Sequence, residues 1–590
     1  MLLRPLMWSL TLTISFALCN VLAQSDETVN FETRITDLVD NYWKEDIDRL
    51  VSPSDREQFY NFYYENYGLL DNLDINSLLG ILGQSQASKE SCETCNKLMG
   101  LGKLFLKTPE AITTLIGSIC KDSASLSKRT CLGLVNLLAE PLAWLFSNSP
   151  LVSQEICSVL AGQRCLKYLS YPHNETIFWE LPLPEKLNFT PKASQKKIRK
   201  ILHLTDIHLD LWYEPNSNAS CNEPLCCRVT SEDWKLKNVS AGYWSEVNGD
   251  CDIPQHFVAD SLKKIVAAHP DLDAVFWTGD NVPHDVWNTT QPINLRHIHT
   301  VTGMISVAFN NIPVFPVLGN HEVHPVNMYI PDSVSKKAPN FNNSWLYDTL
   351  VDDYWARWLD TDKIKETFRR GGFYSKKVTP EWKVVVLNSN MPQKAEKSGS
   401  YVTILGHVPP KHDMYDAWVH NYIRILDRYS HIITSSFFGH THDDEIVVLY
   451  NLEKKPVSVA YISGSLTTYS YLNPQYSIFK LDQTGLPVDS KVYLTDMDSD
   501  NIAFNANHST SPVWQFEYSP KESYRMKNMT ANSWDNFVKQ AETSLDLAFL
   551  YLGHYHRYSK EFTPLSIPEV KRLIRDIRRY SPFLELDGNE

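Results

Sequence analysis

The chain has 590 residues, of which 43% are hydrophobic, and a formal net charge of −13 at pH 7. This length and composition predict two or more globular domains, each large enough to bury a core. The acidic balance argues against nucleic acid as a partner, because proteins that bind phosphate backbones concentrate positive charge.

Residues 1–23 are expected to be a signal peptide. Arg4 precedes a mostly apolar stretch from residue 6 to residue 18, and Val21 and Ala23 stand at the two positions that signal peptidase reads. We therefore expect cleavage after Ala23. No later segment offers about 18 uninterrupted apolar residues, so we expect no transmembrane segment in the mature chain.

The cysteines and the glycosylation sequons agree with a secretory route. Once Cys19 leaves with the signal peptide, ten of the 11 cysteines remain, an even number that suits disulfide pairing in an oxidising compartment. Chance alone yields a few Asn-x-Ser/Thr acceptors, so the use of each site stays open. The acceptors are Asn174, Asn188, Asn218, Asn238, Asn288, Asn342, Asn507 and Asn528.

Residues 24–87 form an N-terminal extension without an assignable fold, whereas residues 88–169 predict a small all-α domain. Apolar residues recur there at helical spacing, as at Leu101, Leu104 and Phe105. Six cysteines are spread along the domain as staples between helices require, and a Cys-x-x-Cys zinc or redox site is the weaker alternative. The domain carries a net charge of +3, which suits either an anionic membrane surface or a solvated helix face.

This arrangement of helices and cysteines resembles a saposin B-type domain, a small helical unit that opens to contact lipid. From the spacing alone, several disulfide connectivities are possible. The resemblance implies the nested pairs Cys92–Cys165, Cys95–Cys157 and Cys120–Cys131. Residues 170–198 follow as a proline-rich linker, and prolines at this density favour an extended connector.

Residues 199–480 predict an α/β domain in which five polar motifs each follow an apolar strand. The apolar runs are residues 201–204, 274–277, 314–318, 402–405 and 436–438. The motifs are Asp206-x-His208, Gly279-Asp280-Asn281, Gly319-Asn320-His321-Glu322, Gly406-His407 and Gly439-His440-Thr441-His442. Because α/β folds place their sites at the carboxyl edge of the sheet, we expect the motifs to converge there.

The side chains in these motifs suit two divalent metal ions. Three offer oxygen and four offer imidazole nitrogen, a set without thiolate that fits zinc, iron or manganese. Each motif alone has a structural explanation, such as a turn or a helix cap. All five in this order predict a two-metal phosphoesterase site. His321, next to Asn320, is the first candidate for a general acid, and His284 is the second.

The five motifs resemble those of the calcineurin-like metallophosphoesterase family from about Arg199 to about Tyr476. The resemblance implies a four-layer β-sandwich flanked by helices, and an attacking hydroxide that bridges the two metals. It assigns the metal ligands as two sets that share Asp280. One set is Asp206, His208, Asp280 and His442, and the other is Asp280, Asn320, His407 and His440.

Two segments near these motifs carry further expectations. Four cysteines follow the first motif, for which Cys221–Cys226 with Cys227–Cys251 is a plausible pairing and a third metal site the alternative. Tyr469, after the last histidines, is expected to line the substrate pocket, although an ordinary turn would explain it as well. Residues 481–590 are expected to form a helical C-terminal region with one basic face.

The order of helical domain, linker, dimetal domain and helical tail is similar to that of the acid sphingomyelinase family, from about residue 90 to residue 590. The similarity implies hydrolysis of sphingomyelin to ceramide and phosphocholine with two Zn²⁺ ions, and lipid presented from an anionic membrane by the saposin domain. It also implies a monomer in the lysosome or the secreted space. An acidic pH optimum is expected because a general acid at His321 must be an imidazolium.

One feature departs from the family, since only the short polar stretch 388–400 connects two neighbouring strands. A catalytically impaired, lipid-binding isoform therefore stays an alternative. A secreted nucleotide phosphodiesterase of the same family is the other.

Overall fold

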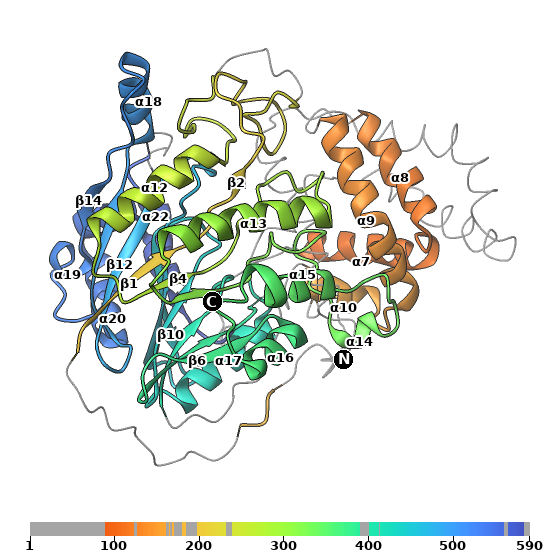
Figure 1. The fold of residues 1–590 in the computed structure, drawn as a ribbon. Coiled ribbons are helices and arrows are strands. Elements are labelled where there is room, and N and C mark those ends of the chain that lie inside the picture. The colour runs from red at the N-terminus through yellow and green to blue at the C-terminus, as the bar shows by residue number, and fades with distance from the viewer. Residues whose placement is uncertain are drawn as a thin grey trace, which may run out of the picture. The chain divides into compact units, whose positions relative to one another are not determined.

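The computed structural model describes residues 89–122, 127–160, 165, 168–169, 180–183, 197–231, 239–389, 400–411, 413–559 and 565–582. The expected signal peptide, the extension over 24–87 and most of the linker lie outside these residues. The chain divides into a helical unit, residues 1–179 with 286–288, and a larger unit, residues 180–285 with 289–590 (Figure 1).

The described residues of the helical unit form four helices, which are stapled by disulfides. The helices are α7 (Lys89–Phe105), α8 (Pro109–Asp122), α9 (Lys128–Asn148) and α10 (Ser153–Leu160). The structure pairs Cys92 with Cys165 and Cys95 with Cys157, which tie α7 to the C-terminal end of the unit. Cys131 is also disulfide-bonded, whereas the side chain of its expected partner, Cys120, lies outside the described residues.

Among the described residues, α9 is long and apolar enough to cross a membrane. Half of its most apolar window is buried inside the protein, including Leu134, Leu138 and Leu145. The expectation of no transmembrane segment was based on uninterrupted apolar runs, whereas α9 meets the criterion through its mean hydropathy.

Two sheets form the centre of the larger unit. The first has the order β14 (Gln515–Tyr518), β13 (Pro487–Leu494), β12 (Gln475–Leu481), β1 (Arg199–Leu204), β4 (Ala274–Trp277) and β5 (Val314–Pro316). The second has the order β15 (Arg578–Arg579), β10 (Glu445–Tyr450), β11 (Pro456–Ile462), β9 (Ile433–Phe438), β8 (Tyr401–Leu405), β7 (Trp382–Val386) and β6 (Tyr374–Lys377). A short pair, β2 (Leu209–Asp210) and β3 (Ile253–Pro254), stands apart from them.

The sheets bury their facing sides against each other. The ring of Phe437 on β9 lies 5.2 Å from Phe276 on β4 and 4.9 Å from Phe479 on β12, measured between ring centroids. Strands of this kind are covered on both faces, which explains why their sequences are nearly continuous runs of hydrophobic residues. The predicted mixed α/β architecture is confirmed.

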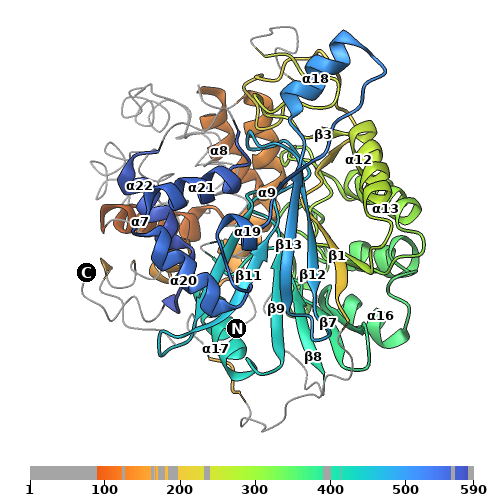
Figure 2. The same ribbon diagram turned by 90° about the vertical axis from the view of Figure 1, so that its left-hand side faces the viewer.

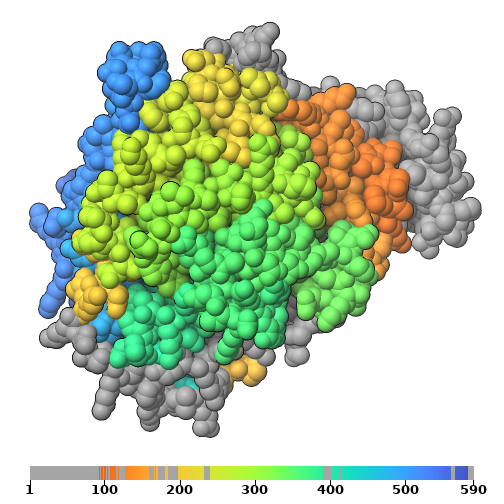
Figure 3. Space-filling model, in the orientation of Figure 1, coloured from red at the N-terminus to blue at the C-terminus, as the bar shows by residue number. Residues whose placement is uncertain are grey.

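Helices cover the outer sides of both sheets. Helices α12 (Gln255–Ala268) and α13 (Gln291–Ala308) lie on one side, and α17 (Asp416–Arg428) and α20 (Ala531–Ala541) pack on β11 on the other (Figure 2). The remaining helices between β5 and β6 are α14 (Asp332–Ser335), α15 (Ser344–Thr349), a π-helix (Leu350–Tyr354) and α16 (Asp362–Gly371). Together with α12 and α13, they form a continuous face of the larger unit (Figure 3).

The C-terminal region contributes strands as well as the helices that the sequence predicted. Its further helices are α18 (Met497–Ala506), α19 (Pro520–Ser523), α21 (Leu545–Tyr555) and α22 (Ile567–Asp576). However, β13 and β14 extend the first sheet, and β15 joins the second. Trp534 and Ile574 belong to the same core as Phe276. The expected boundary after residue 480 therefore does not separate two cores, because short strands of two or four residues give almost no period-two signal.

Candidate metal centre

The strands deliver all five motifs to one edge of the two sheets. Strand β1 runs parallel to β4 and β4 to β5 in the first sheet, and β8 runs parallel to β9 in the second. Each motif follows the carboxyl end of its strand, as expected for an α/β site. Six of the seven expected ligands are buried, and His440 is half-buried.

Asp280 and Asn320 stand at the centre of one group of side chains. The Nε2 atom of His407 lies 3.0 Å from Oδ2 of Asp280 and 2.9 Å from Oδ1 of Asn320. The Nδ1 atom of His440 lies 2.9 Å from the same Asn320 oxygen. The ligand atoms of Asp280, His407 and His440 lie within 4.8 Å of one another, as in a metal site.

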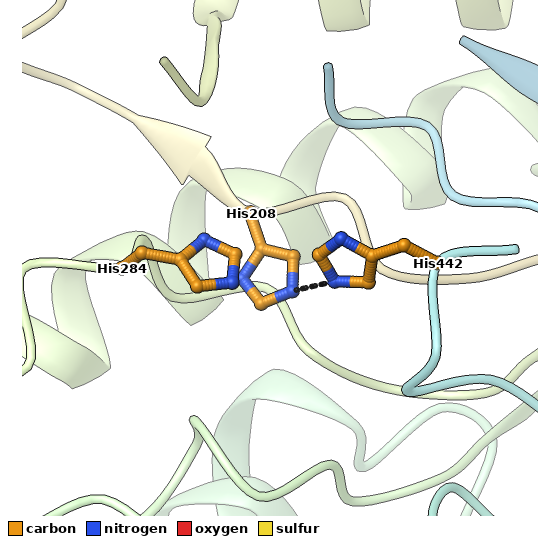
Figure 4. Close-up of side chains that lie close together, drawn as sticks. All are labelled: His208, His284 and His442. Atoms are coloured by element: carbon orange, nitrogen blue, oxygen red, sulfur yellow. Dashed lines mark hydrogen bonds between the residues drawn. The ribbon is translucent and has the colours of Figure 1, made fainter. Parts of the chain in front are cut away.

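A second group joins Asp280 to the histidines of the first and last motifs. The Nε2 atoms of His208 and His442 lie only 3.2 Å apart, and Oδ1 of Asp206 lies 3.8 Å and 3.6 Å from them. Nε2 of His208 is also 3.5 Å from Oδ2 of Asp280. In Figure 4, His208 lies between His284 and His442. Asp280 thus contacts both groups, as expected of a bridging ligand.

The donor atoms fit bound cations. The Nδ1 atoms of His208 and His407 lie 2.7 Å from the backbone oxygens of Val282 and Thr278, where they can only donate. In this tautomer the Nε2 lone pairs point at carboxylate and amide oxygens. Two acceptors that face each other repel unless a cation or a proton lies between them. Burial lowers the pKa of both histidines, but the nearby aspartates more than offset it and raise the pKa to about 9.

The backbone at the ligands is held in an uncommon conformation. Asp206, His208, Asp280, His440 and His442 all have positive φ angles, between 42° and 77°. Non-glycine residues rarely adopt this region, and it costs free energy that the surrounding structure must supply. Five of the seven expected ligands therefore stand on strained backbone.

Glu322 is one of the groups that fixes these turns. Its buried carboxylate accepts hydrogen bonds from the backbone N–H groups of Asp280, Asn281 and Gly319, at 3.1, 2.6 and 2.5 Å. Gly319 is required here because a Cβ atom would overlap the Asp280 carboxylate. Glu322 lies in one of the five motifs, but its role could not be predicted from the sequence.

The two candidate acid histidines both reach the centre. The backbone N–H of His321 donates to Oδ1 of Asp280 at 2.8 Å, and its ring lies 4.8 Å from that of His208. The Nδ1 atom of His284 lies 2.8 Å from Oδ1 of Asp252, which directs its Nε2 atom away from that carboxylate. Burial lowers the pKa of His321 and of His284 well below the usual range.

Tyr469 covers His284. The two rings stack with centroids 3.7 Å apart and an angle of 5° between their planes. The Tyr469 hydroxyl donates to the backbone oxygen of Pro224 at 2.8 Å, so this side chain is anchored in the cysteine-rich loop. Its role in binding substrate stays a prediction.

The cysteine-rich loop supplies a buried arginine that the sequence analysis missed. The structure pairs Cys221 with Cys226 and Cys227 with Cys251. The Arg228 guanidinium donates to both oxygens of Asp210, at 2.7 and 2.8 Å, and to Asp285 at 2.7 Å. Asp210 follows His208 by two residues and Asp285 follows His284 directly, so Arg228 ties the two loops together. An isolated arginine in a loop shows no sequence pattern from which this role could be predicted.

The predicted glycosylation acceptors differ in how exposed they are. Asn288, Asn507 and Asn528 are exposed and Asn342 is half-buried, whereas Asn218 is 2% exposed and accepts a hydrogen bond from Ser220. Asn174, Asn188 and Asn238 lie outside the described residues, as do residues 390–399 of the short connection.

Comparison with known proteins agrees with this centre. Residues 199–444 match the family model of the calcineurin-like phosphoesterases. The chain is 30% identical to a sphingomyelin phosphodiesterase of Homo sapiens, over 81% of this chain and 79% of that one. It is 31% identical to sphingomyelin phosphodiesterase B of Dictyostelium discoideum, over 74% and 71%. Identity to sphingomyelin phosphodiesterase 1 of Caenorhabditis elegans is 29%, over 77% and 85%.

Fold, site and family match define a metallophosphoesterase with His/Asp clusters for metal ions. The whole-chain matches then specify the group. The chain belongs to the sphingomyelin phosphodiesterase family, and it is a phosphoric diester hydrolase.

Proposed function

We propose that this chain hydrolyses sphingomyelin to ceramide and phosphocholine with two zinc ions, held by the seven side chains that the motifs predict. One observation carries the proposal. Asp280 contacts His208 of one ligand group and His407 of the other, in a chain that matches sphingomyelin phosphodiesterases over four fifths of its length.

The ions, when bound, would polarise the phosphoryl oxygens and lower the pKa of water. The protein supplies the geometry and a proton. His321 would donate a proton to the leaving ceramide oxygen, and His284, oriented by Asp252, would hold a phosphoryl oxygen. A general acid must be protonated, and burial lowers the pKa of His321, so we expect an acidic optimum, as in a lysosomal or secreted enzyme.

The helical unit would act as a saposin domain that presents lipid from an anionic membrane. A two-tailed lipid leaving its bilayer loses about 0.8 kcal/mol per CH₂ group, so catalysis needs a surface that shields the tails. The four disulfide-stapled helices and the apolar α9 support this role. We further propose that the protein acts as a monomer and carries glycans at its exposed sequons.

The decisive experiment compares two substrates for the purified full-length chain. Phosphocholine release from vesicles of sphingomyelin and an anionic lipid is measured at acidic pH, beside hydrolysis of nucleoside triphosphates. The chelated protein should lose activity and regain it with two equivalents of zinc. Preference for nucleotides would overturn the lipid proposal and favour the nucleotide phosphodiesterase. Vesicle binding without any turnover would identify an impaired isoform.

A further inference from the structure

A short segment, Gly464–Thr467, touches the backbone of both outer metal-ligand motifs. The N–H of Ser465 donates to the carbonyl of His442 at 3.0 Å, and the N–H of Thr467 donates to the carbonyl of Asp206 at 3.1 Å. The Thr467 hydroxyl also donates to Asp252, the partner of His284, at 2.9 Å. The position of this segment therefore sets the positions of His442, Asp206 and His284 together.

Arg557, from the C-terminal tail, holds this segment in place. Its side chain is fully buried. One guanidinium nitrogen, Nη1, donates to the carbonyl of Ser465 at 2.7 Å, and the other, Nη2, donates to the Ser465 hydroxyl at 3.0 Å. Gly464 permits the approach, because a Cβ atom there would lie 3.1 Å from Cδ of Arg557.

The tail is also fixed around His442 on its other side. The N–H of Asp444 donates to the carbonyl of Tyr555 at 3.2 Å, and Nδ1 of His556 lies 3.4 Å from Oδ1 of Asp443. Arg557 and Tyr558 both have positive φ angles, 52° and 49°. Two consecutive residues just beyond His556, the residue that caps α21, thus hold strained backbone conformations, and this strained turn directs the Arg557 side chain to Ser465.

A contribution to stability alone does not explain why an arginine is buried at position 557. Both contacts of the guanidinium are to neutral oxygens of Ser465. Burial lowers the pKa of Arg557 to about 10, and Asp443, Asp444, Glu517 and Asp206 oppose this only in part. A buried cation that contacts neutral groups costs desolvation free energy, whereas a well-packed apolar side chain would avoid it.

We infer that Arg557 is a positioning residue for the proposed metal centre, acting through Ser465 on His442 and Asp206. The inference rests on the proposed function, since it assigns those two side chains as ligands. It places a determinant of metal binding in the tail, more than a hundred residues beyond the last ligand motif.

The test replaces Arg557 by Met and measures zinc affinity, the unfolding midpoint, kcat and KM in the full-length protein. Loss of such an outer partner typically costs about 10–100-fold in metal affinity or activity. We expect a loss of this size in zinc affinity and in kcat, with little change in KM for sphingomyelin vesicles. Ser465→Ala keeps the carbonyl contact, so it should give a smaller loss that is not additive with Arg557→Met.

Arg579→Met is the matched control. Arg579 is also a buried arginine of the tail, on β15, and it pairs with Asp416 on α17 at 3.6 Å. This variant should lower the unfolding midpoint while it keeps zinc. If both variants lose zinc in proportion to their loss of stability, or if folded Arg557→Met keeps full zinc affinity, the positioning role is wrong.

The same data separate the two proposals. If the wild-type protein binds zinc but fails on sphingomyelin, and Arg557→Met still weakens zinc, then the substrate assignment fails and the positioning role stands. If the wild-type protein and His442→Ala bind zinc equally, His442 is no ligand, and both proposals fail.

Discussion

Two buried arginines hold segments that adjoin the candidate metal centre, Arg228 in the cysteine-rich loop and Arg557 in the C-terminal tail. Burial lowers the pKa of each, but Asp210 and Asp285 more than offset this at Arg228 and raise its pKa. Arg557 contacts the neutral oxygens of Ser465, and its pKa falls to about 10.

Arg228 therefore stabilises the fold as a whole through buried ion pairs, whereas Arg557 holds the position of one segment beside the centre. Removing Arg228 would leave two buried carboxylates without compensation, a global cost in stability. Removing Arg557 would release one loop segment and break no ion pair among the described residues, although the nearby carboxylates of Asp444 and Glu517 would lose a favourable charge interaction. The main cost is therefore one of local geometry. Stability and metal binding can therefore be separated by experiment.

Asp280→Asn should have the largest effect on activity, because Asp280 contacts both ligand groups and its replacement would weaken both expected metal sites. Loss of several kcal/mol of transition-state stabilisation corresponds to a fall in kcat of about 10³-fold or more. Steady-state assays on sphingomyelin vesicles, with zinc content determined by mass spectrometry, would measure it. A variant that retained two zinc ions and most of its turnover would contradict the bridging role.

Arg228→Met should come second and act mainly on stability. Breaking a buried ion pair from one side costs about 3–5 kcal/mol, so the midpoint of urea unfolding should fall sharply. Asp210→Asn combined with Arg228→Met should recover part of the loss, because it removes one uncompensated charge. Equal stability losses for Arg228→Met and Arg557→Met would contradict the claim that the two arginines have different roles.

Asp250 makes a pH-dependent contact where the two sides meet. Its Oδ1 accepts a hydrogen bond from the Tyr471 hydroxyl at 2.9 Å, and burial raises its pKa to about 6. In the unfolded chain the pKa is near 3.9, so between about pH 4 and pH 6 the folded state binds more protons. Stability from this group is therefore complete below pH 4 and is lost as the pH rises through 6.

Asp250→Asn should remove this dependence. Urea unfolding at pH 4.5 and at pH 7 should show a smaller loss of stability with rising pH in the variant, by on the order of 2 kcal/mol. Asp260→Asn, at a carboxylate whose nearest cation is Lys264 on the same helix, is the control. Parallel pH profiles for wild type and Asp250→Asn would exclude a raised pKa at this position.

Tyr469→Ala should have the smallest effect. An aromatic contact of this kind contributes about 0.5–1.5 kcal/mol, so loss of the stack on His284 should lower kcat/KM by roughly 2–10-fold. Tyr469→Phe keeps the stack and loses the bond to Pro224. If the Phe variant is as impaired as the Ala variant, the hydroxyl matters and the stacking does not.

The five strands and the polar side chains that follow them could be predicted from the sequence alone. Each strand is an apolar run that ends at a turn with Gly, Asp or Asn, so both its type and the location of its polar residues are local properties. The proximity of Asp206 and Asp280 also followed, since the parallel strands β1 and β4 end at the same edge of one sheet. His407 follows β8 of the other sheet, so its approach to both carboxylates depended on how the two sheets pack.

The further residues that support the centre could be identified only from the folded structure. Arg228, Asp252 and Arg557 stand in loops and in the tail without a periodic pattern, and their partners lie up to 215 residues away. The strands β14 and β15 were missed for the same reason, since they have only four and two residues and lie at sheet edges. Short segments are selected by the sheet edges they cover, and this selection depends on contacts that no local pattern records.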